Sequence, residues 1–181
     1  MTIISCRKGL PSCFEARHGA ALLFRTDIDP KRVGVAGPGL SGMRAWMLMS
    51  LDERITCGVA VSGTTRLSDW LSANGQDGRL IAPWAAGLLR TFDSEAVMAL
   101  CAPRRLHIAS GDRDPFAPAS GFEVFRKTVG KVYGLHDEGR SFTATLFKGS
   151  GGQLTREKWD SLLETFDNEF SPKGPARSIL P

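Results

Sequence analysis

The segment RVGVAGPGLSGMRAW, from Arg32 to Trp46, contains the turn whose residues could do chemistry. In one interpretation, Gly37, Gly39 and Gly42 form the GxGxxG pattern of a loop that holds the pyrophosphate of a dinucleotide. In the other, the same strand-to-helix turn is the GxSxG pattern that presents a nucleophilic serine, with Gly39 at the nucleophile position. The first interpretation predicts a cofactor site, and the second predicts an enzyme without its reactive oxygen.

The dinucleotide interpretation requires an acidic residue for the ribose at the end of the next strand, about twenty residues after the glycines. That strand instead ends VAVSGTT, at residues 59–65, with hydroxyl side chains and no carboxylate. Tight glycine turns between a strand and a helix also occur in α/β proteins that bind no nucleotide. We therefore keep dinucleotide binding as an alternative and expect no cofactor.

Ser41 is the hydroxyl closest to the turn, two residues beyond the nucleophile position. A serine at a helix start usually bonds to the backbone, and a catalytic serine needs a base within hydrogen-bonding distance. His107 falls inside an apolar strand, where a histidine is usually part of the core. His18 lies upstream of the turn and His136 in a connection, so none of the three is placed as that base. Ser41 is kept as an alternative nucleophile.

The histidines, cysteines and carboxylates show no metal-ligand spacing. Asp112 and Asp114 flank Arg113 on one loop, a pattern more typical of surface ion pairs than of a cation site. We therefore predict no metal.

Four short apolar runs rich in β-branched residues indicate strands at residues 32–36, 55–63, 106–112 and 143–149. Their nearly continuous apolar character is typical of strands buried on both faces of a sheet. Helical patterns lie between and after them. Asp93 and Thr155 are expected to cap two of these helices, and Ser120 with Glu123 to form a capping box for another. The alternation predicts an α/β protein with three layers, α/β/α, and a mainly parallel sheet of about four strands.

The composition is that of one globular domain. The 181 residues are 42% hydrophobic and 23% charged, and the chain is long enough to bury well over half of its unfolded surface. Four cysteines without CxxC spacing favour a reducing compartment, and no run approaches the roughly 18 apolar residues of a membrane span. The net charge of +4 comes from scattered basic residues, which argues against nucleic-acid binding. We expect a cytoplasmic protein with a single domain over residues 1–181, its core at about 20–170 and irregular ends, that binds no membrane.

Three separated segments resemble motifs of the α/β-hydrolase superfamily, and in particular bacterial esterases of the dienelactone hydrolase and acetyl xylan esterase type. Residues 28–63 resemble a strand, the elbow GxSxGGMRAW, a helix and LDxRI before the next strand. Residues 83–118 resemble a PGLLRxFD run, an APRPL approach and the strand that delivers the acid. Residues 147–170 resemble the turn GxGHxYTPEMW and the last helix, so that the resemblance covers about residues 20–170.

The resemblance implies positions for a catalytic triad. Gly39 occupies the nucleophile position and Gly152 the histidine position, so both are vacant, whereas Asp114 retains the acid that orients the histidine. The backbone N–H of Leu40 corresponds to one donor of the oxyanion hole. The resemblance therefore implies a protein derived from a serine carboxylic-ester hydrolase of small-molecule esters, catalytically inactive as this chain. A residually active esterase that uses Ser41 and a dinucleotide-binding protein are the alternatives.

The resemblance also implies that the chain corresponds to the C-terminal half of the fold, because only about thirty residues precede Arg32 where the family has several strands and helices. Without those strands, the strand at 32–36 would expose its N–H and C=O groups along one edge. We expect this edge to pair with a second copy of the chain or a complementary fragment, or to leave the chain unstable.

Overall fold

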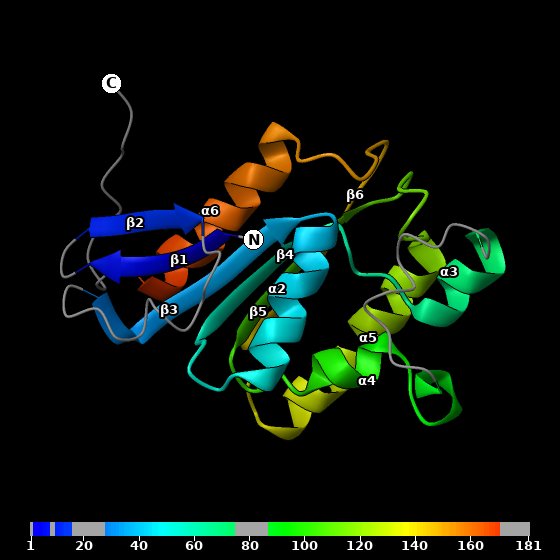
Figure 1. The fold of residues 1–181 in the computed structure, drawn as a ribbon, viewed down its shortest axis with the longest axis horizontal. Helices are drawn as coiled ribbons and strands as arrows, with labels where there is room; N and C mark the ends of the chain where they lie inside the picture. The colour runs from blue at the N-terminus through cyan, green and yellow to red at the C-terminus, as the bar shows by residue number, and fades with distance from the viewer. Residues whose placement is uncertain (1, 8–9, 16–27, 75–86, 171–181) are drawn as a thin grey trace.

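The computed structural model of the chain describes residues 2–7, 10–15, 28–74 and 87–170. They form a six-stranded sheet in the order β2-β1-β3-β4-β5-β6, with helices on both of its faces (Figure 1). The strands are β1 Thr2–Arg7, β2 Leu10–Glu15, β3 Ile28–Pro38, β4 Cys57–Val61, β5 Arg105–Gly111 and β6 Phe142–Phe147. The helices are α2 Leu40–Leu51, α3 Leu67–Asn74, α4 Ser94–Ala99, α5 Ala119–Leu135 and α6 Arg156–Phe170, with short 3-10 turns η2 Leu88–Arg90 and η3 Gly139–Ser141.

Strands β3 to β6 are adjacent and parallel, so the predicted α/β class with four parallel strands is confirmed. The register places Ala36 opposite Val59, and Val59 opposite His107. All five residues of β4 are buried, as expected for a central strand covered on both faces. Because the four strands run in the same direction, the loops that leave their carboxyl ends meet at one end of the sheet.

Strand β3 has a neighbour on each side, which contradicts the predicted open edge. β1 pairs with β3 in antiparallel register, from Thr2 opposite Ala36 to Arg7 opposite Ile28, and β2 pairs with β1. The sequence carries a signal for these strands, because β-branched residues are frequent in TIISCR and Gly9 separates the two runs. The predicted open edge is therefore wrong, because the chain supplies its own partner strand for β3, whereas self-association itself stays a prediction.

Different helices cover the two faces of the sheet, which confirms the three layers (Figure 1). On one face, α2, α4 and α5 bury side chains such as Trp46 and Phe125 against Val35 and Ile108 of the strands. On the other face lies α6, in a cluster made of Ala36, Cys57, Val59, Val61, Ala109, Leu162, Phe166 and Phe170. Successive strand residues point to opposite faces, so burial of both faces accounts for the continuous apolar runs in the sequence.

Two of the predicted helix caps are present and one is not. The Asp93 side chain accepts a hydrogen bond from the first N–H of α4 at 2.6 Å, and the Thr155 hydroxyl accepts one from the first turn of α6 at 3.4 Å. The capping box of Ser120 and Glu123 is wrong, because α5 begins at Ala119, with Pro118 in the cap position two residues before Ser120. A proline has a fixed φ and no N–H, so the helix starts beside it without a side-chain cap.

Candidate functional site

The predicted site residues lie on loops that leave the carboxyl ends of the parallel strands. Gly39 follows β3, Asp114 follows β5 and Gly152 follows β6, while Ser62 and Gly63 follow β4. Backbone hydrogen bonds join neighbouring loops and strands: Gly39 donates to β4, Ser62 donates to β5, and residues 112–113 donate to β6 and to the loop after it. The fold therefore brings positions far apart in the sequence to one end of the sheet, which is where open α/β sheets bind ligands.

Gly39 is the sharpest point of the turn between β3 and α2. Its φ of 54° and ψ of −127° fall in a region that residues with a side chain rarely adopt. Its N–H donates to the carbonyl oxygen of Val61 at 2.8 Å, which holds the turn against the neighbouring strand. A Cβ at Gly39 would meet no atom within 4 Å, so a side chain here would stand in open space. A nucleophile elbow needs this arrangement, and the position has the backbone without the side chain.

The glycines around the elbow are required by close backbone packing. A Cβ at Gly42 would lie 2.4 Å from the carbonyl oxygen of Ser62, and one at Gly37 would lie 2.6 Å from the backbone of Ser41. A Cβ at Gly63 would lie 2.1 Å from the carbonyl oxygen of the elbow residue. The packing of the turn thus accounts for Gly37 and Gly42 of the GxGxxG pattern, independently of any nucleotide.

Helix α2 begins directly after the elbow. The N–H of Leu40 is the first of the helix and has no acceptor within it, as an oxyanion donor requires. Leu40 is 40% exposed, so this residue lies at the surface. Ser41 is half-buried in the first turn of α2, and its position is the helix start that the sequence predicts for it.

Asp114 is the predicted acid, and the structure places it beside Gly152, the predicted histidine position. Its side chain is buried, and Oδ1 accepts a hydrogen bond from the N–H of Phe116 at 2.9 Å. The hydroxyl of Thr65, after β4, donates to the carbonyl oxygen of Phe116 at 2.6 Å and so holds the acid loop. A Cβ at Gly152 would lie 2.9 Å from Oδ2 of Asp114 and 3.1 Å from Oδ1. An acid and a histidine in these two positions would be in direct contact.

Lys158 is a site residue that the sequence analysis missed. It lies in the first turn of α6, and its side chain is fully buried. Its ammonium donates hydrogen bonds to the carbonyl oxygens of Gly151 and Gln153, which flank the histidine position. Burial lowers the pKa of Lys158, and the negative charge of Asp114 raises it. The sequence around Lys158 did not indicate its burial, because a lysine within an amphipathic helix is usually exposed.

The described histidines are used elsewhere. His107 on β5 is buried; its Nδ1 lies 2.8 Å from the hydroxyl of Thr143, and its Nε2 lies 2.7 Å from the hydroxyl of Ser161. Burial lowers the pKa of His107 to about 4. His136 is exposed at the end of α5, and His18 lies outside the described residues. The interpretation of His107 as a packed core histidine is confirmed by these contacts.

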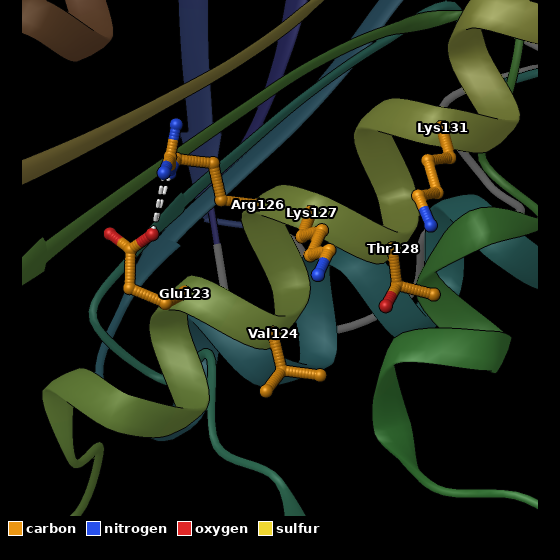
Figure 2. Close-up of a pocket in the computed structure, with 6 residues that line it drawn as sticks. All are labelled: Glu123, Val124, Arg126, Lys127, Thr128 and Lys131. Atoms are coloured by element: carbon orange, nitrogen blue, oxygen red, sulfur yellow. Dashed lines mark hydrogen bonds and ion pairs between the residues drawn. The ribbon is translucent and has the colours of Figure 1, made fainter.

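A surface hollow beside α5 has no part in this site. Figure 2 shows the hollow, which is lined from one helix by Glu123, Val124, Arg126, Lys127, Thr128 and Lys131. Glu123 and Arg126 form an ion pair at 2.6 Å, and Lys127 and Lys131 are exposed. None of the triad positions lines it, so the carboxyl end of the sheet is the better candidate site.

Within the described ranges, no group of three or more histidines, cysteines and carboxylates is placed to hold a metal ion. Asp112 is exposed while Asp114 is buried, so the two carboxylates lie in different environments. The same part of the chain contains no helix with the length and apolar character to cross a membrane.

Comparison with known proteins gives a curated relative and several solved structures. No protein-family model matches the chain. The relative, described as "Putative hydrolase YtaP" from Bacillus subtilis (strain 168), is 27% identical over 109 residues, which are 60% of this chain and 36% of that protein. This chain therefore spans little more than a third of the relative's length.

The similar solved structures are esterases. A glucuronoyl esterase from Solibacter usitatus has a TM-score of 0.69 at 20% identity, and the match covers 83% of this chain and 46% of the other. A CE15 glucuronoyl esterase from Caldicellulosiruptor kristjansonii has a TM-score of 0.66 at 21% identity, over 81% and 45% of the two chains. Methylesterase BT1017 has a TM-score of 0.61 at 20% identity, over 83% and 32%. The narrower likeness to dienelactone hydrolases and acetyl xylan esterases stays a prediction. With its parallel sheet and the sharp turn at Gly39, this chain has the α/β-hydrolase fold.

Proposed function

We propose that this chain is a non-catalytic protein of the ester-hydrolase kind, which binds a small carboxylic ester, or the acid formed from one, at the carboxyl end of its sheet. The observation that carries the proposal is the turn at Gly39, where the backbone geometry of an elbow coincides with the absence of a side chain. A glycine has no atom that can attack a carbonyl carbon, and Gly152 has none that can accept a proton. Binding would use the N–H of Leu40 at the start of α2.

Ester turnover tests the non-catalytic part of the proposal. We expect the chain to hydrolyse p-nitrophenyl acetate and the methyl ester of glucuronic acid no faster than buffer. The second probe is chosen because the similar structures are named glucuronoyl esterases. Saturable turnover that Ser41→Ala abolishes would contradict the proposal and favour the residually active esterase.

Ligand titration followed by amide NMR tests the binding part. We expect the methyl ester of glucuronic acid, or glucuronic acid itself, to shift the amide signals of Leu40 and Gly152. The amide of Lys127, in the hollow beside α5, serves as the internal control and should not shift. If NAD shifts the signals around the turn and neither sugar compound does, the dinucleotide alternative is supported and the ester proposal fails.

A further inference from the structure

Lys158 is a buried cation that the α/β-hydrolase fold alone does not explain. Its exposed fraction is 0%, although lysine is almost never fully buried unless its charge is paired. It is not accessible to a ligand, so it is neither a nucleophile nor a binding group. The reason for its burial must therefore lie in its neighbours.

Two of these neighbours are carbonyl groups on either side of the histidine position. The Lys158 ammonium donates to the carbonyl oxygen of Gly151 through a short hydrogen bond and to that of Gln153 at 3.1 Å. One side chain thus ties the loop around Gly152 to the first turn of α6. An ammonium has three donors and no acceptor, so carbonyl and carboxylate oxygens are its natural partners.

The carboxylate of Asp114 faces the same loop, at position 152. This side chain is 6% exposed, and a buried carboxylate is stabilised by a nearby positive charge. In a triad that charge comes from the histidine, which becomes a cation during the reaction. Here position 152 is glycine. A side chain at this position would point at the carboxylate, but glycine has no side chain and supplies no charge. The Lys158 ammonium binds the two carbonyls that flank this position, so it lies against the same loop that faces the Asp114 carboxylate, and the negative charge of Asp114 raises the pKa of Lys158.

We propose that Lys158 is a positioning residue that takes the electrostatic place of the missing histidine: its ammonium balances the Asp114 carboxylate and holds the loop around Gly152. This inference rests on the proposed function, because it explains how the site stays folded when no imidazole is present. In the motif that this segment resembles, positions 152 and 158 are histidine and methionine, whereas this chain has Gly152 and Lys158; positions 154 and 156 also differ from that motif.

A double-mutant cycle between Lys158 and Asp114 tests the pairing, with the folding equilibrium constant measured by urea denaturation. Methionine is the matched replacement for Lys158, because it is unbranched, uncharged and suited to a buried position. We expect Lys158→Met to lower the folding equilibrium constant by at least about tenfold, because it leaves a buried charge and two carbonyls without a partner. In the Asp114→Asn background, Lys158→Met should lower the folding equilibrium constant by a factor at least about threefold smaller.

The control is Lys127→Met, which removes an exposed lysine of α5 and should change the equilibrium constant by less than about twofold. Coupling between Lys158 and Asp114 below about threefold overturns the inference. A loss from Lys127→Met as large as that from Lys158→Met also overturns it, because the effect would then not depend on the site.

A second measurement decides the question if Lys158→Met does not fold. The pKa of Lys158 is followed by NMR of lysine side chains in the unchanged protein and in Asp114→Asn. If Asp114 is the partner, its neutralisation lowers the pKa of Lys158 by at least about half a unit. An unchanged pKa overturns the inference, because a purely structural lysine would not respond to that charge.

The outcomes of these tests of Lys158 can be distinguished from the outcomes of the tests of the proposed function. Ester turnover by the unchanged chain would contradict the non-catalytic proposal and would leave the coupling between Lys158 and Asp114 as measured. Additive effects in the cycle would overturn the role of Lys158 and would leave the binding experiment as measured.

Discussion

A Cβ at Gly152 would lie 2.9 Å from Oδ2 of Asp114, so the acid of the hydrolase pattern faces the position where that pattern has histidine. Gly39, whose N–H donates to Val61 of β4, has the backbone conformation of an elbow, with open space in the direction of its missing side chain. Of the three positions predicted for a triad, Asp114 is the one that has a side chain. This arrangement leads to predictions on chemistry and on stability.

Restoring two side chains should restore a reactive oxygen. We expect Gly39→Ser with Gly152→His to react with a fluorophosphonate at position 39 about 100-fold faster than Gly39→Ser alone, because a positioned general base contributes about that factor or more. The rate is measured by mass spectrometry of the labelled protein. Addition of Asp114→Asn should remove most of the gain, because the acid orients the histidine. Equal labelling rates for the single and double variants would show that position 152 does not face the elbow.

Gly63 should be the least replaceable glycine of the site. Its φ is +87°, and a Cβ would lie 2.1 Å from the carbonyl oxygen of Gly39. We expect Gly63→Ala to lower the free energy of unfolding by at least about 2 kcal/mol, because backbone must move to admit the methyl group. Gly130→Ala is the control. Gly130 lies inside α5, where a Cβ would make ordinary contacts with Phe142 of β6. Because alanine has a higher helix propensity than glycine, this change should raise the free energy of unfolding by about 0.5–1 kcal/mol. Thermal unfolding of the two variants in parallel gives the comparison, and a tolerated Gly63→Ala would contradict the packing of the turn.

The Asp93 side chain caps the starts of two helices, so its removal should lower the free energy of unfolding by more than the removal of an ordinary cap. Its carboxylate accepts from the N–H of Leu67 at 2.8 Å, from the N–H of Ser68 at 3.1 Å and from the N–H of Ser94 at 2.6 Å, at the starts of α3 and α4. We expect Asp93→Ala to lower the free energy of unfolding by about 2–4 kcal/mol, measured by urea denaturation. Asp160→Ala, which removes an exposed ion pair of α6, should cost less than about 1 kcal/mol.

Asp93 should also contribute to the acid sensitivity of the fold. Burial by itself raises the pKa of Asp93, but hydrogen bonds from Ser68, Ser94 and Leu67 outweigh it, so the pKa is below the ordinary value of 3.8. Because the folded state holds the proton less tightly than the unfolded chain, this stability is present above that value and is lost as the pH falls through the folded pKa. Asp93→Asn should therefore flatten the decline of stability below about pH 4. An unchanged decline would assign the acid sensitivity to other carboxylates.

His107 should make stability depend on pH in a higher range. Burial lowers its pKa to about 4 from 6.5, so between these values the unfolded chain binds a proton that the folded protein does not. Stability is then fully present above the unfolded pKa and falls as the pH drops, by about 2 kcal/mol between about pH 7.5 and pH 5. His107→Gln should remove this component, whereas His136→Gln, at an exposed position, should keep it. Denaturation curves at the two pH values check the prediction, and an identical slope in His107→Gln would contradict it.

Local features of the fold could be predicted because their causes are local. The strand-to-helix order follows from runs of apolar and β-branched residues, and Asp93 and Thr155 cap the helices that immediately follow them. The capping box at Ser120 failed because Pro118, two residues earlier, starts the helix first. The prediction of an open edge at β3 was wrong because strand pairing depends on a segment elsewhere in the chain, and the apolar runs in β1 and β2 are short.

The sequence by itself determined that the predicted nucleophile and histidine positions, Gly39 and Gly152, carry no side chain, because glycine has none in any fold. Only the tertiary structure decided which groups surround those positions. It places Asp114 against position 152, buries His107 between two hydroxyls, and directs the Lys158 ammonium onto the loop carbonyls. These contacts depend on the approach of separate elements, and the charge of a buried group is set by neighbours that residue spacing along the chain does not reveal.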